Sequence, residues 1–87
     1  MQFPDELDGA RVLFHTPEGD FGDLYYTDGG VAAHYCYLAI CRYASGEYYL
    51  FFCNEQCEVE QDYDFDSAEA CMYCAEATYG DVTWIRK

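Results

Sequence analysis

Four cysteines in the second half of the chain have a spacing that could bind zinc. Cys53 and Cys57 are separated by three residues, and Cys71 and Cys74 by two. Thiolates are zinc ligands, and two of them three positions apart on a helix share one face. The segment between Cys53 and Cys57 has no glycine, however, and Cys71 falls on an apolar helical stripe. We therefore expect buried free thiols and no metal or cofactor, with a zinc site at these four cysteines as the alternative.

A second pattern is an alternation of acidic and apolar side chains over residues 57–65. Side chains two positions apart in a strand point to the same face, so the acidic ones are predicted to share one solvent-exposed face. The four carboxylates that we expect to bind a partner are those of Glu58, Glu60, Asp62 and Asp64. The stretch around them is strongly acidic, because no lysine or arginine occurs in residues 43–85.

The overall charge narrows the classes of partner. The chain has 17 aspartates and glutamates against 4 lysines and arginines, which gives a formal net charge of −13. Such a surface repels nucleic-acid phosphates and anionic membranes, whereas it attracts basic proteins. We predict a basic protein surface as the partner, with no direct nucleic-acid binding and no membrane binding. The alternative is a homodimer or larger homo-oligomer whose acidic surface only keeps it in solution.

Catalytic chemistry has little support in the sequence. His34 and Cys36 are two apart and could form a nucleophilic pair on one face of a strand. Leu38 and Ile40 continue the same alternation, however, which predicts that this face belongs to the core. Gly29 and Gly30 are not followed by the Lys-Ser/Thr of a phosphate-binding loop. We predict that the protein is not an enzyme.

Tyrosines form a further candidate surface. They occur on both faces of their predicted strands, so one set packs on the helix and the other is left to bind a protein or, in an aromatic cleft, a small molecule. Cover of that face by loops or by a second copy of the chain is the alternative. The tyrosines concerned are Tyr25, Tyr26, Tyr35, Tyr37, Tyr48 and Tyr49.

These side chains must be positioned by a small α+β fold. With 87 residues, the chain predicts a single domain over 1–87. Its turn signals and apolar runs predict an antiparallel sheet of about five or six strands. We expect a first hairpin from two strands joined by residues 17–20, and a second from two strands joined by residues 44–47. The predicted strands cover 11–16, 21–27, 34–43, 48–53, 57–65 and, after the helix, 81–86.

One helix is predicted at about residues 67–79, packed on one face of the sheet. Asp66 is the expected N-cap, with Glu69 three residues later as in a capping box. Small and apolar side chains recur at helical spacing through this segment, and Gly80 is a typical helix terminator. Residues 1–10 contain three acidic residues and no long apolar run, so we expect neither a signal peptide nor a membrane span, and a cytoplasmic location.

The second half of the chain resembles small bacterial proteins of unknown function carried on mobile elements, such as integron gene cassettes. The resemblance lies in residues 49–53, 57–67, 68–79 and 82–84. It implies a bacterial cytoplasmic protein. In size and charge the chain is also similar to acidic inhibitors, namely immunity proteins, anti-CRISPR proteins and DNA mimics. Our leading hypothesis is therefore an acidic protein-binding module that inhibits a partner by occupying its basic surface.

Overall fold

The centre of the fold is built from the two most apolar segments of the chain. In the computed structural model, which describes residues 2–87, β5 (Tyr37–Arg42) and β6 (Tyr48–Cys53) pair antiparallel across a tight turn. Gly46 in that turn has a φ of 104°, which glycine adopts at little cost. Because both faces of this hairpin are covered, its side chains are almost all buried. The predicted second hairpin is confirmed.

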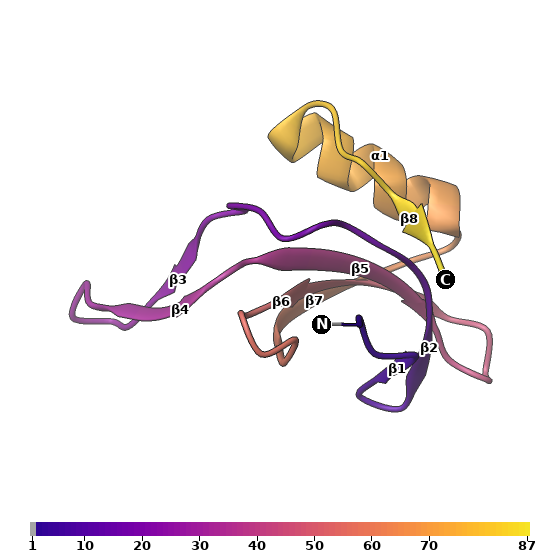
Figure 1. Cartoon of the computed structure of the whole chain (residues 1–87), viewed down its shortest axis with the longest axis horizontal. Helices are drawn as coiled ribbons and strands as arrows, with labels where there is room; N and C mark the ends of the chain where they lie inside the picture. The colour runs from indigo at the N-terminus through magenta and orange to yellow at the C-terminus, as the bar shows by residue number, and fades with distance from the viewer. Residues whose placement is uncertain (1) are drawn as a thin grey trace.

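The remaining strands extend this hairpin into a curled antiparallel sheet (Figure 1). The strand order is β1-β2-β5-β6-β7, with β8 paired to β2, and β3 and β4 form a separate two-stranded sheet. The predicted α+β class with five or six strands is therefore confirmed. The bounds are β1 Glu6–Leu7, β2 Ala10–His15, β3 Asp23–Tyr25, β4 Val31–His34, β7 Val59–Phe65 and β8 Ile85–Arg86.

The curl of the sheet divides the core in two. Leu7 of β1 and Val59 of β7 come from opposite ends of the strand order yet pack in one cluster, which requires the sheet to bend around it. We call this the inner cluster; its buried members include Phe3, Leu7, Val12, Cys36, Tyr37, Cys41, Phe51, Cys53 and Cys57. The helix-side cluster, on the other face, includes Leu38, Ile40, Leu50, Phe52, Cys71 and Ala75.

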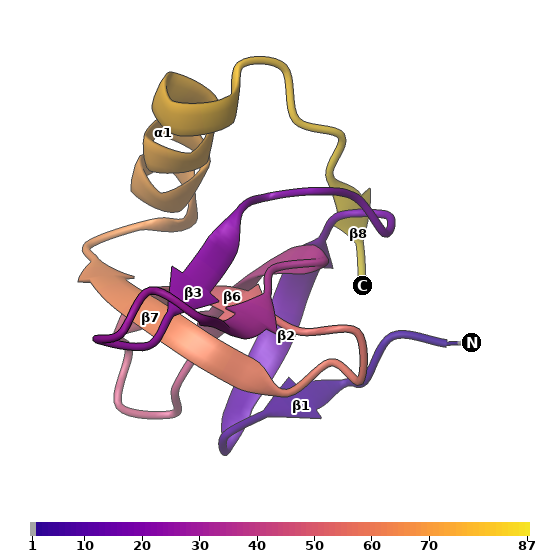
Figure 2. The same cartoon turned by 90° about the vertical axis from the view of Figure 1, so that its left-hand side faces the viewer.

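Helix α1 (Ala68–Tyr79) covers the outer face of the sheet (Figure 2). Cys71 and Ala75 are its buried residues, and their small side chains let the helix lie close to the aromatic strands. The N-cap is Ser67, whose side chain accepts a hydrogen bond from the Ala70 N–H at 3.1 Å, and not Asp66 as predicted. Ser67 takes this role because it is the extended residue immediately before the first helical turn. Gly80 ends the helix as expected.

The predicted first hairpin is wrong. β2 pairs with β5, while β3 pairs with β4 across the turn at residues 28–30. Thr16 explains the difference: its backbone N–H donates to the Leu38 carbonyl, and its buried hydroxyl accepts from the Leu38 N–H. These bonds hold the end of β2 beside β5, so the chain cannot reverse there to pair with the next strand.

The predicted strand over residues 34–43 is split in two, and the predicted last strand is short. Tyr35 belongs to the helix-side cluster, whereas Cys36 and Tyr37 both belong to the inner cluster, so the alternation slips by one residue between β4 and β5. Of residues 81–86, only Ile85 and Arg86 pair as a strand. Within residues 2–87, no helix has the length and apolar character that crossing a bilayer requires.

Candidate protein-binding surface

The strand that carries the acidic residues lies at the edge of the sheet. β7 pairs with β6 on one side, and no other strand of the described chain pairs with its outer side. Its middle residues, Asp62, Tyr63 and Asp64, are all exposed. The ring of Tyr63 is 49% exposed although it packs edge-on against Phe52. β7 therefore exposes two carboxylates and an aromatic ring, which point to opposite faces of the strand.

A bulge divides the predicted acidic face. Phe52 pairs with Gln61 but Cys53 pairs with Val59, which leaves Glu60 as the extra residue. The bulge moves Val59 to the inner face, whereas Phe65 packs on the helix side. The prediction that the apolar residues of 57–65 share one face and the acidic residues the other is therefore wrong. The cause is the extra residue, which reverses the facing of every side chain beyond it.

The four predicted carboxylates consequently form two pairs. Glu58, just before β7, and Glu60 each accept a hydrogen bond from the side-chain amide of Asn54, at 3.0 Å in both cases. Asp62 and Asp64 lie further along the strand, opposite Phe51 and Tyr49 of β6, on the inner face. The first pair is held by the turn before the strand, and the second pair is free in solvent.

A third carboxylate, which the sequence did not single out, acts on the same tyrosine as Asp62. The hydroxyl of Tyr43 donates to the backbone carbonyl of Asp8 at 3.0 Å, and its ring contacts the ring of Tyr49 edge-on. Burial, followed by the Asp8 carboxylate, raises the pKa of Tyr43, and Tyr49 and Asp62 add to the effect. Asp8 and Asp62 are thus both close to this phenol. We call Asp8, Asp62 and Asp64 the acidic edge.

The β3–β4 hairpin forms a second exposed region, which extends away from the rest of the molecule (Figure 1). Tyr25, Tyr26 and Val31 are exposed by 59%, 61% and 57%. Of the other tyrosines considered from the sequence, Tyr35 and Tyr37 are buried and the pair at 48–49 is half-buried. The exposed aromatic surface is therefore on this hairpin, at Tyr63 and, on helix α1, at Tyr73, which is 77% exposed.

A histidine between two carboxylates ties this hairpin to the preceding loop. His34 Nδ1 lies 2.5 Å from Oδ1 of Asp23, and its Nε2 lies 3.4 Å from Oδ1 of Asp20. The hydrogen bond with Asp23 is the main cause that raises the pKa of His34. His34 is exposed, whereas Cys36 lies in the inner cluster, where burial raises the pKa of its thiol. The two do not form a nucleophilic pair.

The cysteines do not converge either. Cys53 and Cys57 lie in the inner cluster, while Cys71 lies on the opposite face of the sheet in the helix-side cluster, with Cys74 packed against it. Within residues 2–87, no three or more cysteine, histidine or acidic side chains are grouped so that they could hold a metal ion. Burial raises the pKa of Cys53 and of Cys71 to about 12. These thiols are positioned as small apolar core residues.

The chain matches no family model, and neither a curated protein nor a solved structure matches it. The fold and the surfaces described above are therefore the basis for a functional proposal.

Proposed function

We propose that this protein binds a basic surface of a partner protein through its acidic edge. The observation that carries the proposal is the position of Asp62 and Asp64, both exposed on an edge strand. Asp8 acts on the same tyrosine as Asp62. Carboxylates clustered in this way raise the local concentration of a cationic partner and orient its approach. An inhibitor that occupies a nucleic-acid-binding groove would use the same chemistry, with carboxylates in place of phosphates.

The partner is expected to engage side chains and not to extend the sheet. An exposed strand edge with unpaired backbone groups can template pairing with another chain, and charged residues on the edge oppose this. Asp62 and Asp64 serve that purpose here, so a second strand is disfavoured. Lysine and arginine side chains can reach the same carboxylates without backbone pairing. Tyr63 is exposed on the opposite face of the strand, so it is not part of this carboxylate surface.

The proposal is tested with a partner captured at low salt from a bacterial lysate and then purified. Its affinity should fall as salt rises, because salt screens attraction between exposed charges. The variant Asp62→Asn/Asp64→Asn should bind at least about tenfold more weakly, since two charge contacts are lost. The matched control is Glu76→Gln/Asp81→Asn, which removes two exposed charges at the far end of the helix.

The control separates a defined surface from an effect of net charge. It should change the affinity by less than about twofold if binding is confined to the acidic edge. Equal losses in the two double variants would contradict the proposed surface. An affinity that is the same at low and high salt would contradict the electrostatic mechanism. Light scattering on the free protein tests the alternative of a homodimer.

A further inference from the structure

The few cations of this acidic chain are gathered in one corner. Arg11 of β2 and Arg42 of β5 are register partners on adjacent strands. Arg86 of β8 lies on the other side of β2 with its guanidinium over the ring of Phe14, and Lys87 follows it and forms an ion pair with Asp5. All 4 lysines and arginines of the sequence are in this group. The fold thus creates a basic region that charge counting along the sequence does not reveal.

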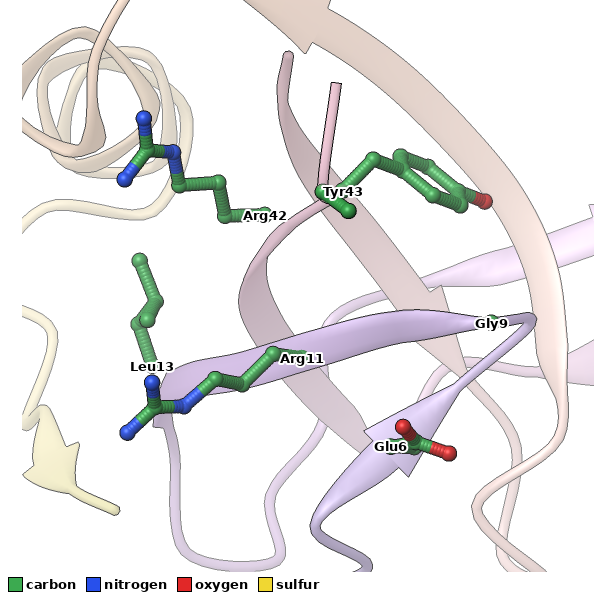
Figure 3. Close-up of a pocket in the computed structure, with 7 residues that line it drawn as sticks. Glu6, Gly9, Arg11, Leu13, Arg42 and Tyr43 are labelled. Atoms are coloured by element: carbon green, nitrogen blue, oxygen red, sulfur yellow. The ribbon is translucent and has the colours of Figure 1, made fainter. Parts of the chain in front are cut away.

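A surface pocket of about 370 Å³ opens between the two paired arginines (Figure 3). The guanidinium ends of Arg11 and Arg42 reach to the same side of it with Leu13 between them, and Glu6 lies on the other side. Arg42 is further held by the ring of Tyr48, whose centroid is 5.2 Å from its guanidinium carbon. This cation–π contact limits the rotamers of Arg42.

A negative charge near the two paired arginines would reduce the repulsion between them. Like charges directly opposite each other on antiparallel strands repel, which destabilises the pair. The ion pairs formed within residues 2–87 involve His34 or Lys87, so no carboxylate of that part of the chain lies within 4.0 Å of either guanidinium. Two positive groups therefore face one cavity, whose lining has a single carboxylate, that of Glu6, the register partner of Arg11 on β1.

We propose that this pocket binds a small molecule through an oxyanion, a phosphate or a carboxylate, placed between Arg11 and Arg42. The planar guanidinium fork matches the oxygens of both groups and forms short charge-assisted hydrogen bonds with them. Leu13 contacts a short apolar part of the ligand, and Glu6 accepts a hydrogen bond from a hydroxyl or amino group at its other end. A polyanion is disfavoured, because the net charge of −13 repels every phosphate beyond the pocket.

The test is a titration of the isotope-labelled protein with inorganic phosphate and, separately, with succinate, followed by NMR at constant ionic strength. At least one of them should cause saturable shifts in the amide signals of Arg11, Arg42 and Tyr43. Saturation by phosphate alone identifies a phosphate site, and saturation by succinate identifies a carboxylate site. Shifts that do not saturate with either ion, or that spread over the whole surface, would overturn the proposal.

Variants distinguish the pocket from general attraction to the basic corner. Arg42→Gln should weaken binding of the saturating ion by about tenfold, since a hydrogen bond between charged groups is lost. Arg86→Gln removes the same charge from the same corner but outside the pocket lining, and should change binding by less than about twofold. Equal weakening by both variants would show attraction to charge alone and would contradict the site. The unliganded spectrum of each variant verifies that it is folded.

Discussion

The two hairpins of this protein share a topology and have opposite environments. Both are antiparallel, turn at a glycine and contain tyrosines. β5–β6 forms six residue pairs, is flanked by β2 and β7, and has a core cluster on each face. β3–β4 forms three pairs, stands outside the main sheet and exposes its aromatic side chains. The central hairpin is richer in apolar residues and is covered on both faces, and these two features together separate it from the exposed hairpin.

The comparison indicates where stability and recognition reside. An isolated two-stranded hairpin is marginally stable in water, so β3–β4 depends on a few contacts with the rest of the molecule. One is Leu24, which packs against the helix-side cluster, and another is the His34 bridge to the preceding loop. Regions of this kind open locally at low free-energy cost, whereas opening of the covered central hairpin is expected to cost more.

The largest effect is expected from Phe51→Ala in the central hairpin. Phe51 is 1% exposed in the inner cluster, so its truncation leaves a cavity and should cost about 3–5 kcal/mol of unfolding free energy. Urea unfolding followed by circular dichroism measures the loss. Phe51→Leu, which retains much of the volume, should lose clearly less. A loss below about 1 kcal/mol for Phe51→Ala would contradict a well-packed inner cluster.

A smaller, pH-dependent effect is expected in the exposed hairpin. The hydrogen bond with Asp23 raises the pKa of His34 above its ordinary value of 6.5. The stabilising contribution of charged His34 is therefore complete below that value and is lost as the pH rises through the raised pKa. NMR titration of the His34 ring should show a midpoint above 6.5, and Asp23→Asn should move it back down. A wild-type midpoint at or below 6.5 would rule out this bridge.

The smallest effect on stability is expected from the exposed tyrosines. Tyr25→Ala and Tyr26→Ala should each change the unfolding free energy by less than about 0.5 kcal/mol, because their rings are largely in solvent. If the hairpin contributes to partner binding beside the acidic edge, the same variants should weaken affinity by about tenfold. Loss of stability comparable to that of Phe51→Ala would show that the hairpin is part of the core after all.

The sequence predicted those elements whose signals are local. The helix follows from a capping residue, a stripe of small side chains and Gly80, and the β5–β6 hairpin from two apolar runs around a short turn. The sequence does not distinguish Asp66 from Ser67 as the N-cap, because both residue types can cap a helix and the backbone geometry determines which of them does.

Features that depend on distant partners were missed. The pairing of β2 with β5 depends on hydrogen bonds between Thr16 and Leu38, and the bulge at Glu60 depends on the register with β6. For the same reason the sequence singled out Asp62 but not Asp8, which meets Tyr43 only through the tertiary fold. The alternation of acidic residues correctly located an acidic strand, although not the face of each side chain.

Because its cysteines lie on both faces of the sheet, local opening of the protein can be followed by chemical modification of their thiols. Five thiols are buried, and Cys74 is partly accessible. A thiol must become a thiolate in contact with solvent before it is alkylated, so a buried one reacts only while its surroundings are open. Alkylation of the thiols in the inner cluster would report opening of that face of the sheet; these are Cys36, Cys41, Cys53 and Cys57. Alkylation of Cys71 would report movement of the helix away from the other face. Alkylation kinetics resolved by mass spectrometry would thus give separate opening rates for the two faces of one sheet, without any introduced label.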